Sequence, residues 1–177
     1  IRQPLDNLRN AGLIYGQIIY NKAPVMMEKL VDKMGEANFR SGIQEYLKTY
    51  SYGNATWDDL IRILDSKTAE DLAAFSDVWV NRKGMPTLTF RTDGQELEIR
   101  QHDPYNRGLL WLQRFAVTLC GERDSVIRVN MTDTLFRMQL PFVPSRVLPN
   151  TDGRGYGVFV PDEPALHWLA AHWWEIE

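Results

Sequence analysis

Apolar residues follow two different periods along the chain. Over residues 24–79, large apolar side chains recur every three or four positions, as in helices that bury one face. Over residues 86–160, they alternate with polar side chains, as in strands that bury one face. The change of period near Gly84 predicts an α+β chain in two parts. A bundle of about four short helices comes first, and an antiparallel β-sandwich of six or seven strands and a C-terminal helix follow.

Four helices are predicted in the first part, with turn residues at their ends. The first is expected from about Pro24 to Gly35, and the second over about residues 36–50. Thr56 and Thr68 are each followed three positions later by an aspartate, which predicts the N-terminal caps of the third and fourth helices. The faces expected to be buried are Met27, Leu30, Val31 and Met34; Phe39, Ile43, Leu47 and Tyr50; Trp57, Leu60, Ile61 and Leu64; and Leu72, Phe75 and Trp79.

Strand signals in the second part are bounded by turn and breaker residues. Asp93-Gly94 predicts a hairpin between the first two strands. Pro141 and Pro144 restrict the segment that follows them to a sheet edge or a bend. A last strand is expected over residues 156–160.

The chain closes with a helical pattern over residues 164–176. One face of this predicted helix carries Leu166, Leu169, Trp173 and Ile176. Such a face exposes an apolar patch unless something covers it, and we expect more of the same polypeptide to do so.

Tyr20 and Lys22 are polar residues placed between an apolar pair and the first predicted helix. We expect both at or just before the helix start, where unpaired backbone N–H groups and the positive end of the helix dipole gather. A tyrosine hydroxyl at such a place could donate a hydrogen bond to a developing oxyanion. The alternative is a packing role, with the hydroxyl in water or on a backbone group.

The composition excludes several classes of function. A net charge of −3 with both signs interspersed argues against a nucleic-acid partner. No apolar run is long enough to span a membrane. Hydrophobic residues make up 44% of the 177 residues, which is enough for a packed core, so we expect one large domain or two small ones.

Spacing alone assembles no complete catalytic or metal-binding set. The single cysteine, Cys120, excludes an intrachain disulfide and a cysteine-based zinc site, and we expect it to be buried at a strand end. His102, His167 and His172 are interpreted as surface or packing residues. The last two are five positions apart, whereas a helical zinc pair needs four. The tryptophans favour packing over a carbohydrate or peptide groove.

Several segments in series resemble one known family. Residues 20–27, Tyr-Asn-Lys-Ala-Pro-Val-Met-Met, resemble the tyrosine segment of the M1 zinc aminopeptidases, which are gluzincins. Residues 34–47 are similar to a helix of the same family with the pattern Gly-Glu-x-x-Phe and Gly-x-x-x-Tyr-Leu. Residues 52–60, which begin Tyr-Gly-Asn-Ala-Thr, are similar to the turn and capped helix that follow it in the family. Further similar segments are Trp79 with Gly84-Met85-Pro86, and residues 150–156. The chain departs from the family at Ala23-Pro24, where glycine usually follows the lysine, and at Gly157-Val158, where many members have Tyr-Arg.

The resemblance implies a C-terminal fragment of a zinc aminopeptidase. Residues 1–84 would end the thermolysin-like catalytic domain, residues 85–161 would form the β-sandwich domain, and residues 162–177 would begin a helical domain. The zinc ligands would lie upstream of this chain, so the fragment would bind no zinc and be inactive alone. The family's tyrosine that stabilises the transition state, jointly with zinc, corresponds to Tyr20. Tyr15 competes for that position but lacks the following x-Lys.

Three hypotheses about the whole protein stay open at this point. The first is a metallo-aminopeptidase that acts on peptides, with the remaining domains of the same polypeptide as partners. The second is a non-catalytic M1-like scaffold or binding module. The third treats the sandwich as a separate ligand-binding unit. We prefer a structural role for the sandwich, in which it braces the catalytic domain. For the compartment, our expectation is a bacterial cell envelope or periplasm.

Overall fold

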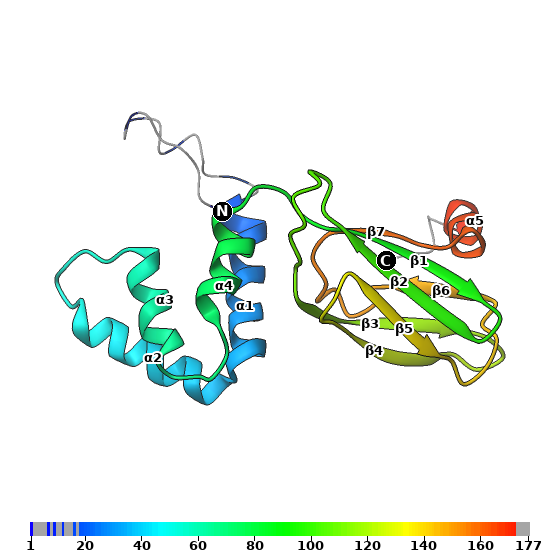
Figure 1. Cartoon of the computed structure of the whole chain (residues 1–177), viewed down its shortest axis with the longest axis horizontal. Helices are drawn as coiled ribbons and strands as arrows, with labels where there is room; N and C mark the ends of the chain where they lie inside the picture. The colour runs from blue at the N-terminus through cyan, green and yellow to red at the C-terminus, as the bar shows by residue number, and fades with distance from the viewer. Residues whose placement is uncertain (2–6, 8, 10–11, 13–15, 17, 173–177) are drawn as a thin grey trace. The chain divides into compact units, whose positions relative to one another are not determined.

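A computed structural model describes residues 1, 7, 9, 12, 16 and 18–172 (Figure 1). The chain divides into two compact units, Ile1–Lys83 and Gly84–Glu177. Helices make up the secondary structure described in the first unit, and the second contains two sheets and a helix, so the predicted fold class is confirmed. None of the helices in the described part of the chain is both long and apolar enough to cross a membrane.

The helical unit follows the predicted order of helices with an unpredicted π-helical turn at each end. Its elements are η2 (Ile18–Lys22), α1 (Ala23–Met34), α2 (Glu36–Thr49), α3 (Trp57–Asp65), α4 (Leu72–Ser76) and η3 (Asp77–Asn81), where η marks a π-helix. Gly35 ends α1 with a φ of 82°, and its N–H donates to the carbonyl of Val31 over 2.8 Å. Glycine takes this backbone conformation at little cost, so the predicted end of the first helix is confirmed.

One of the two predicted helix caps is correct and the other is wrong. Thr56 caps α3 in a capping box: its hydroxyl accepts from the N–H of Asp59, and the Asp59 carboxylate accepts from the N–H of Thr56. The cap of α4 is Asp71, whose carboxylate accepts from the N–H of Ala74 over 2.7 Å. Thr68 instead accepts from the N–H of Glu70 in the preceding turn. The helix therefore begins one turn later than its first capping signal predicts.

The buried faces of α1 and α2 also differ from the pattern. Met26 and Lys29 are buried in α1, whereas the predicted Met27 and Val31 are half-buried. In α2 only Gly42 is buried, and Leu47 is 62% exposed. In α2 the close contact is made at the glycine: a Cβ on Gly42 would lie 2.5 Å from Cδ2 of Leu64 in α3. The packing of α2 on α3 is therefore centred on this small residue and not on the larger side chains that the periodicity predicts.

The second unit is a β-sandwich. One sheet has the order β5-β2-β1-β7 and the other the order β4-β3-β6. The strands are β1 (Thr87–Asp93), β2 (Glu96–His102), β3 (Gln113–Cys120), β4 (Ser125–Met131), β5 (Leu135–Gln139), β6 (Arg146–Pro149) and β7 (Val158–Val160). The hairpin at Asp93-Gly94 and the edge position of β6 are as predicted. β7 is parallel to β1, which corrects the all-antiparallel expectation. The reason is the long connection from β6, which changes sheets before β7 begins.

Side chains from both sheets form one apolar core. Leu88, Leu97 and Ile99 from one sheet and Phe115 and Leu119 from the other are buried there. The Phe115 ring lies 5.2 Å from that of Phe159 and 6.3 Å from that of Phe90, in edge-on arrangements. Cys120 is buried at the end of β3, as predicted, and burial raises the pKa of its thiol.

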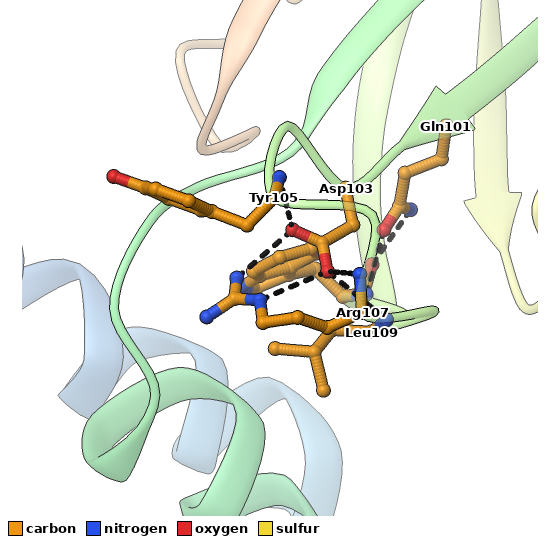
Figure 2. Close-up of polar contacts among 6 residues, drawn as sticks. Gln101, Asp103, Tyr105, Arg107 and Leu109 are labelled. Atoms are coloured by element: carbon orange, nitrogen blue, oxygen red, sulfur yellow. Dashed lines mark hydrogen bonds and ion pairs between the residues drawn. The ribbon is translucent and has the colours of Figure 1, made fainter.

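A buried carboxylate orders the connection between β2 and β3 (Figure 2). Asp103 accepts from the backbone N–H of Tyr105 and of Arg107, and also from Nε and Nη2 of Arg107 over 3.1 and 2.9 Å. The Arg107 guanidinium lies 4.7 Å from the centre of the Tyr105 ring. The Arg107 guanidinium, together with these backbone donors, holds the pKa of Asp103 well below its usual range.

The C-terminal helix, α5 (Glu163–His172), packs on the sandwich. Asp162 caps it by accepting from the N–H of Ala165 over 3.2 Å, and Arg146 of β6 lies 4.3 Å from the centre of the Trp168 ring. On the predicted apolar face, Leu166 is 45% exposed. Trp173 and Ile176, also predicted for this face, lie outside the described residues.

Candidate functional site

Tyr20 lies in the middle of the π-helical turn η2, with a side chain that is 67% exposed. Its N–H donates to the carbonyl of Gly16 over 3.0 Å, and the backbone of Lys22 is helical, so η2 continues directly into α1. Tyr20 and Lys22 lie just before the start of α1, as expected, but the helical turn η2 precedes that start and its hydrogen bond pairs the backbone N–H of Tyr20. The group that Tyr20 presents to solvent is its phenol and not its backbone N–H.

Lys22 belongs to the same turn, but its side chain is 9% exposed. Burial lowers the pKa of its ammonium group below the ordinary value for lysine. The two polar residues that the sequence singles out are thus brought together in one turn with opposite environments. Tyr15, which competes for the role of Tyr20, lies outside the described residues.

A cavity of about 430 Å³ lies in the helical unit beside this turn. One wall is formed by the start of α1, which follows η2 directly, with Ala23, Met26 and Met27 as lining residues. The remaining lining residues are Ile1, Thr56, Trp57, Asp58, Val80 and Asn81. In a regular helix, residues three and seven positions apart lie on one side, so Ala23 and Met27 would share a side with Tyr20. Tyr20 belongs to a π-helical turn with more residues per turn, which shifts its side chain away from that alignment.

Another part of the cavity wall is formed by the start of α3. The capping box at Thr56 fixes this helix end, and the indole Nε1 of Trp57 donates to Oγ of the buried Ser76 over 2.7 Å. The hydrogen bond joins α3 to α4 and orients the Trp57 ring, so the cavity wall is well defined. The sequence predicts Trp57 on the buried face of α3, and the structure places it half-buried at the cavity.

The described residues do not fit a zinc site. No three histidine, cysteine, aspartate or glutamate side chains gather closely enough among them to hold a metal ion. His102 and His167 are exposed, and Nδ1 of the half-buried His172 lies 2.8 Å from the carbonyl of Trp168. Trp111 is fully buried, in agreement with the packing role predicted for it.

Comparison with solved structures supports the fold. A crystal structure of Legionella pneumophila aminopeptidase A in complex with aspartic acid aligns with 82% of this chain and 18% of its own, with a TM-score of 0.57 and 17% sequence identity. At this identity the likeness describes the fold alone.

Sequence comparisons support the resemblance to the M1 family. Residues 1–79 match the family model described as the peptidase family M1 domain. Tricorn protease-interacting factor F2 of Thermoplasma volcanium is 30% identical over 95 residues, which cover 54% of this chain and 12% of the relative. Endoplasmic reticulum aminopeptidase 2 of Homo sapiens is 28% identical over 198 aligned residues, which cover 88% of this chain and 20% of the relative. The resemblance to the M1 family is thereby confirmed, and the chain spans no more than about a fifth of these relatives.

Sequence reasoning missed two features of this site, the burial of Lys22 and the cavity. A single lysine between Asn21 and Ala23 carries no signal that its side chain turns inward. The cavity is lined by four segments distant in sequence, and no local pattern brings them together; they lie around Ile1, Met26, Trp57 and Val80. The one available signal for the cavity is the spacing of Ala23 and Met27 from Tyr20, and this spacing indicates only a shared side of a helix.

Proposed function

We propose that this chain is part of a zinc-dependent M1 aminopeptidase that removes N-terminal residues from peptides. On this proposal the Tyr20 hydroxyl stabilises the oxyanion that develops during hydrolysis. The supporting observation is the exposed phenol of Tyr20, on a π-helical turn within the segment that matches the M1 domain. π-Helical turns are rare and occur often at functional sites.

On this proposal, the hydroxyl of Tyr20 acts as a hydrogen-bond donor. When a nucleophile adds to the scissile carbonyl, negative charge grows on its oxygen, and a phenolic O–H can donate to that oxygen without giving up its proton. A side chain held on a helical turn can meet the charge with little rearrangement, which is the basis of this kind of stabilisation. The proposal requires an accessible hydroxyl, and 67% exposure of the side chain meets that requirement.

The zinc ligands, on the same proposal, belong to parts of the protein outside this chain. The 177-residue chain by itself then hydrolyses no aminoacyl anilide, and zinc added in solution restores no activity. Turnover by the purified chain, at a rate that follows its concentration, would contradict this part of the proposal.

The decisive experiment is Tyr20→Phe in the intact protein, because phenylalanine keeps the ring and removes only the hydroxyl. We expect kcat for an aminoacyl anilide to fall by about 10²–10³, the usual loss for one oxyanion donor, with unchanged zinc content. Tyr52→Phe is the matched control, since Tyr52 is an exposed tyrosine in the loop after α2. Wild-type turnover in Tyr20→Phe would refute the catalytic role of Tyr20.

The scaffold hypothesis has its own test in the coding region upstream of residue 1. A catalytic protein requires a His-Glu-x-x-His segment there, and a frame without it favours a binding module with the same fold. For the sandwich we propose the bracing role. Deleting residues 85–161 from the intact protein is expected to lower peptidase activity, and unchanged activity would contradict that role.

A further inference from the structure

The turn η2 holds two neighbouring polar side chains in opposite environments. Tyr20 is 67% exposed and Lys22 is 9% exposed. Residues two positions apart on a helical turn point to nearly opposite sides, so one side chain turns outward when the other turns inward. The direction of the Tyr20 phenol and the burial of Lys22 are therefore linked by the geometry of the turn.

A buried lysine is a strong positional constraint. Removing an ammonium group from water costs free energy unless hydrogen-bond acceptors replace the water, so its position is restricted to places that supply them. Burial lowers the pKa of Lys22, which agrees with this partial loss of solvent. The four-carbon stem adds apolar contact along its length. Lys22 thus fixes the rotation of η2 about its axis more firmly than an exposed residue could.

We propose that Lys22 is a positioning residue for Tyr20: its buried side chain anchors the π-helical turn so that the phenol is presented outward. This inference rests on the proposed function of Tyr20. It assigns Lys22 no contact with substrate and no proton transfer. Its effect on hydrolysis passes entirely through the direction of the Tyr20 side chain.

The kinetic test uses Lys22→Met in the intact protein, because methionine keeps an unbranched stem and removes the ammonium group. Misplacement of a catalytic group is costly, so we expect kcat to fall by about tenfold or more while KM changes less than about threefold. Lys29→Met is the matched control: Lys29 is a lysine of α1 that is 7% exposed, with Nζ lying 5.2 Å from the centre of the Trp79 ring. We expect that control to change stability and to leave kcat unchanged.

The double variant Tyr20→Phe/Lys22→Met separates positioning from other effects. If Lys22 acts through Tyr20, the second substitution adds no further loss of kcat to the first. Fully additive losses, or wild-type kcat in Lys22→Met, would overturn the positioning role while Tyr20→Phe stays defective. Wild-type kcat in Tyr20→Phe itself would instead overturn the proposed function.

A spectroscopic test needs no activity and uses the 177-residue chain. With fluorotyrosine incorporated, the ¹⁹F resonance of Tyr20 is assigned as the one lost in Tyr20→Phe. We expect Lys22→Met to shift or broaden this resonance, and Lys29→Met to leave it in place. An unmoved Tyr20 resonance in folded Lys22→Met would overturn the inference whatever the kinetics show.

Discussion

The two units of this chain bury their apolar side chains in different ways. The sandwich buries residues of both sheets in one core, with Leu88, Leu97 and Ile99 fully buried. The helical unit leaves a cavity of about 430 Å³, buries only Gly42 of α2, and exposes Tyr20 and Leu47. The candidate site at Tyr20 lies in the helical unit, in the π-helical turn that leads into α1 beside this cavity.

The largest effect on stability is expected in the sandwich core. Phe115→Ala removes a buried ring that contacts two other rings, so we expect a loss of about 3–5 kcal/mol in the free energy of unfolding. Leu47→Ala in α2 removes an exposed side chain and is expected to cost less than about 0.5 kcal/mol. Urea denaturation of both variants measures the difference. Equal losses would contradict the exposed position of Leu47 in the helical unit.

A smaller effect is expected at the contact between α2 and α3. Glycine to alanine within a helix usually stabilises it, but at Gly42 the new methyl group would lie 2.5 Å from the fully buried Leu64. We therefore expect Gly42→Ala to destabilise the helical unit by about 1–2 kcal/mol, as overpacked sites do. Ala37→Gly, at an exposed position of the same helix, is the control, with an expected loss of about 0.5–1 kcal/mol from propensity alone. A stabilised Gly42→Ala variant would mean that the two helices separate readily.

The effect that we place last is electrostatic and belongs to the loop at Asp103. Because Arg107 and backbone donors lower the pKa of Asp103 in the folded chain, its ionised form stabilises that state. This contribution is complete above the unfolded-state pKa, about 3.9, and is lost as the pH falls through the lower folded-state value. Asparagine keeps the shape and one acceptor oxygen but places an NH2 group where the second oxygen accepts, so Asp103→Asn removes the charge together with the hydrogen bonds to that oxygen.

The urea concentration at the midpoint of unfolding, measured between pH 7 and pH 2, tests this contribution of ionised Asp103 to stability. The wild-type midpoint is expected to fall below about pH 4 more steeply than that of Asp103→Asn, and the two curves converge at low pH. Asp93→Asn, at an exposed hairpin position of the same unit, is the matched control and is expected to follow the wild type. Parallel curves for wild type and Asp103→Asn would contradict the assignment of the acid-sensitive contribution to this carboxylate.

Local signals in the sequence predicted many elements of the fold. Gly35 ends α1, the capping box at Thr56 begins α3, and Asp93-Gly94 joins β1 and β2, because backbone conformation and nearby hydrogen bonds decide each of these features. The prediction failed where a local signal had a nearby competitor. Thr68 and Asp71 both resemble caps, and the structure uses Asp71.

The sequence by itself determined the order and type of the elements and pointed to Tyr20, since periodicity and short motifs are properties of neighbouring residues. Only the tertiary structure decided that Leu47 stays exposed, that β7 runs parallel to β1, and that Lys22 turns inward. Each of these outcomes depends on packing between segments far apart in the chain. Such packing is a competition among whole surfaces, and no window of sequence contains both sides of it.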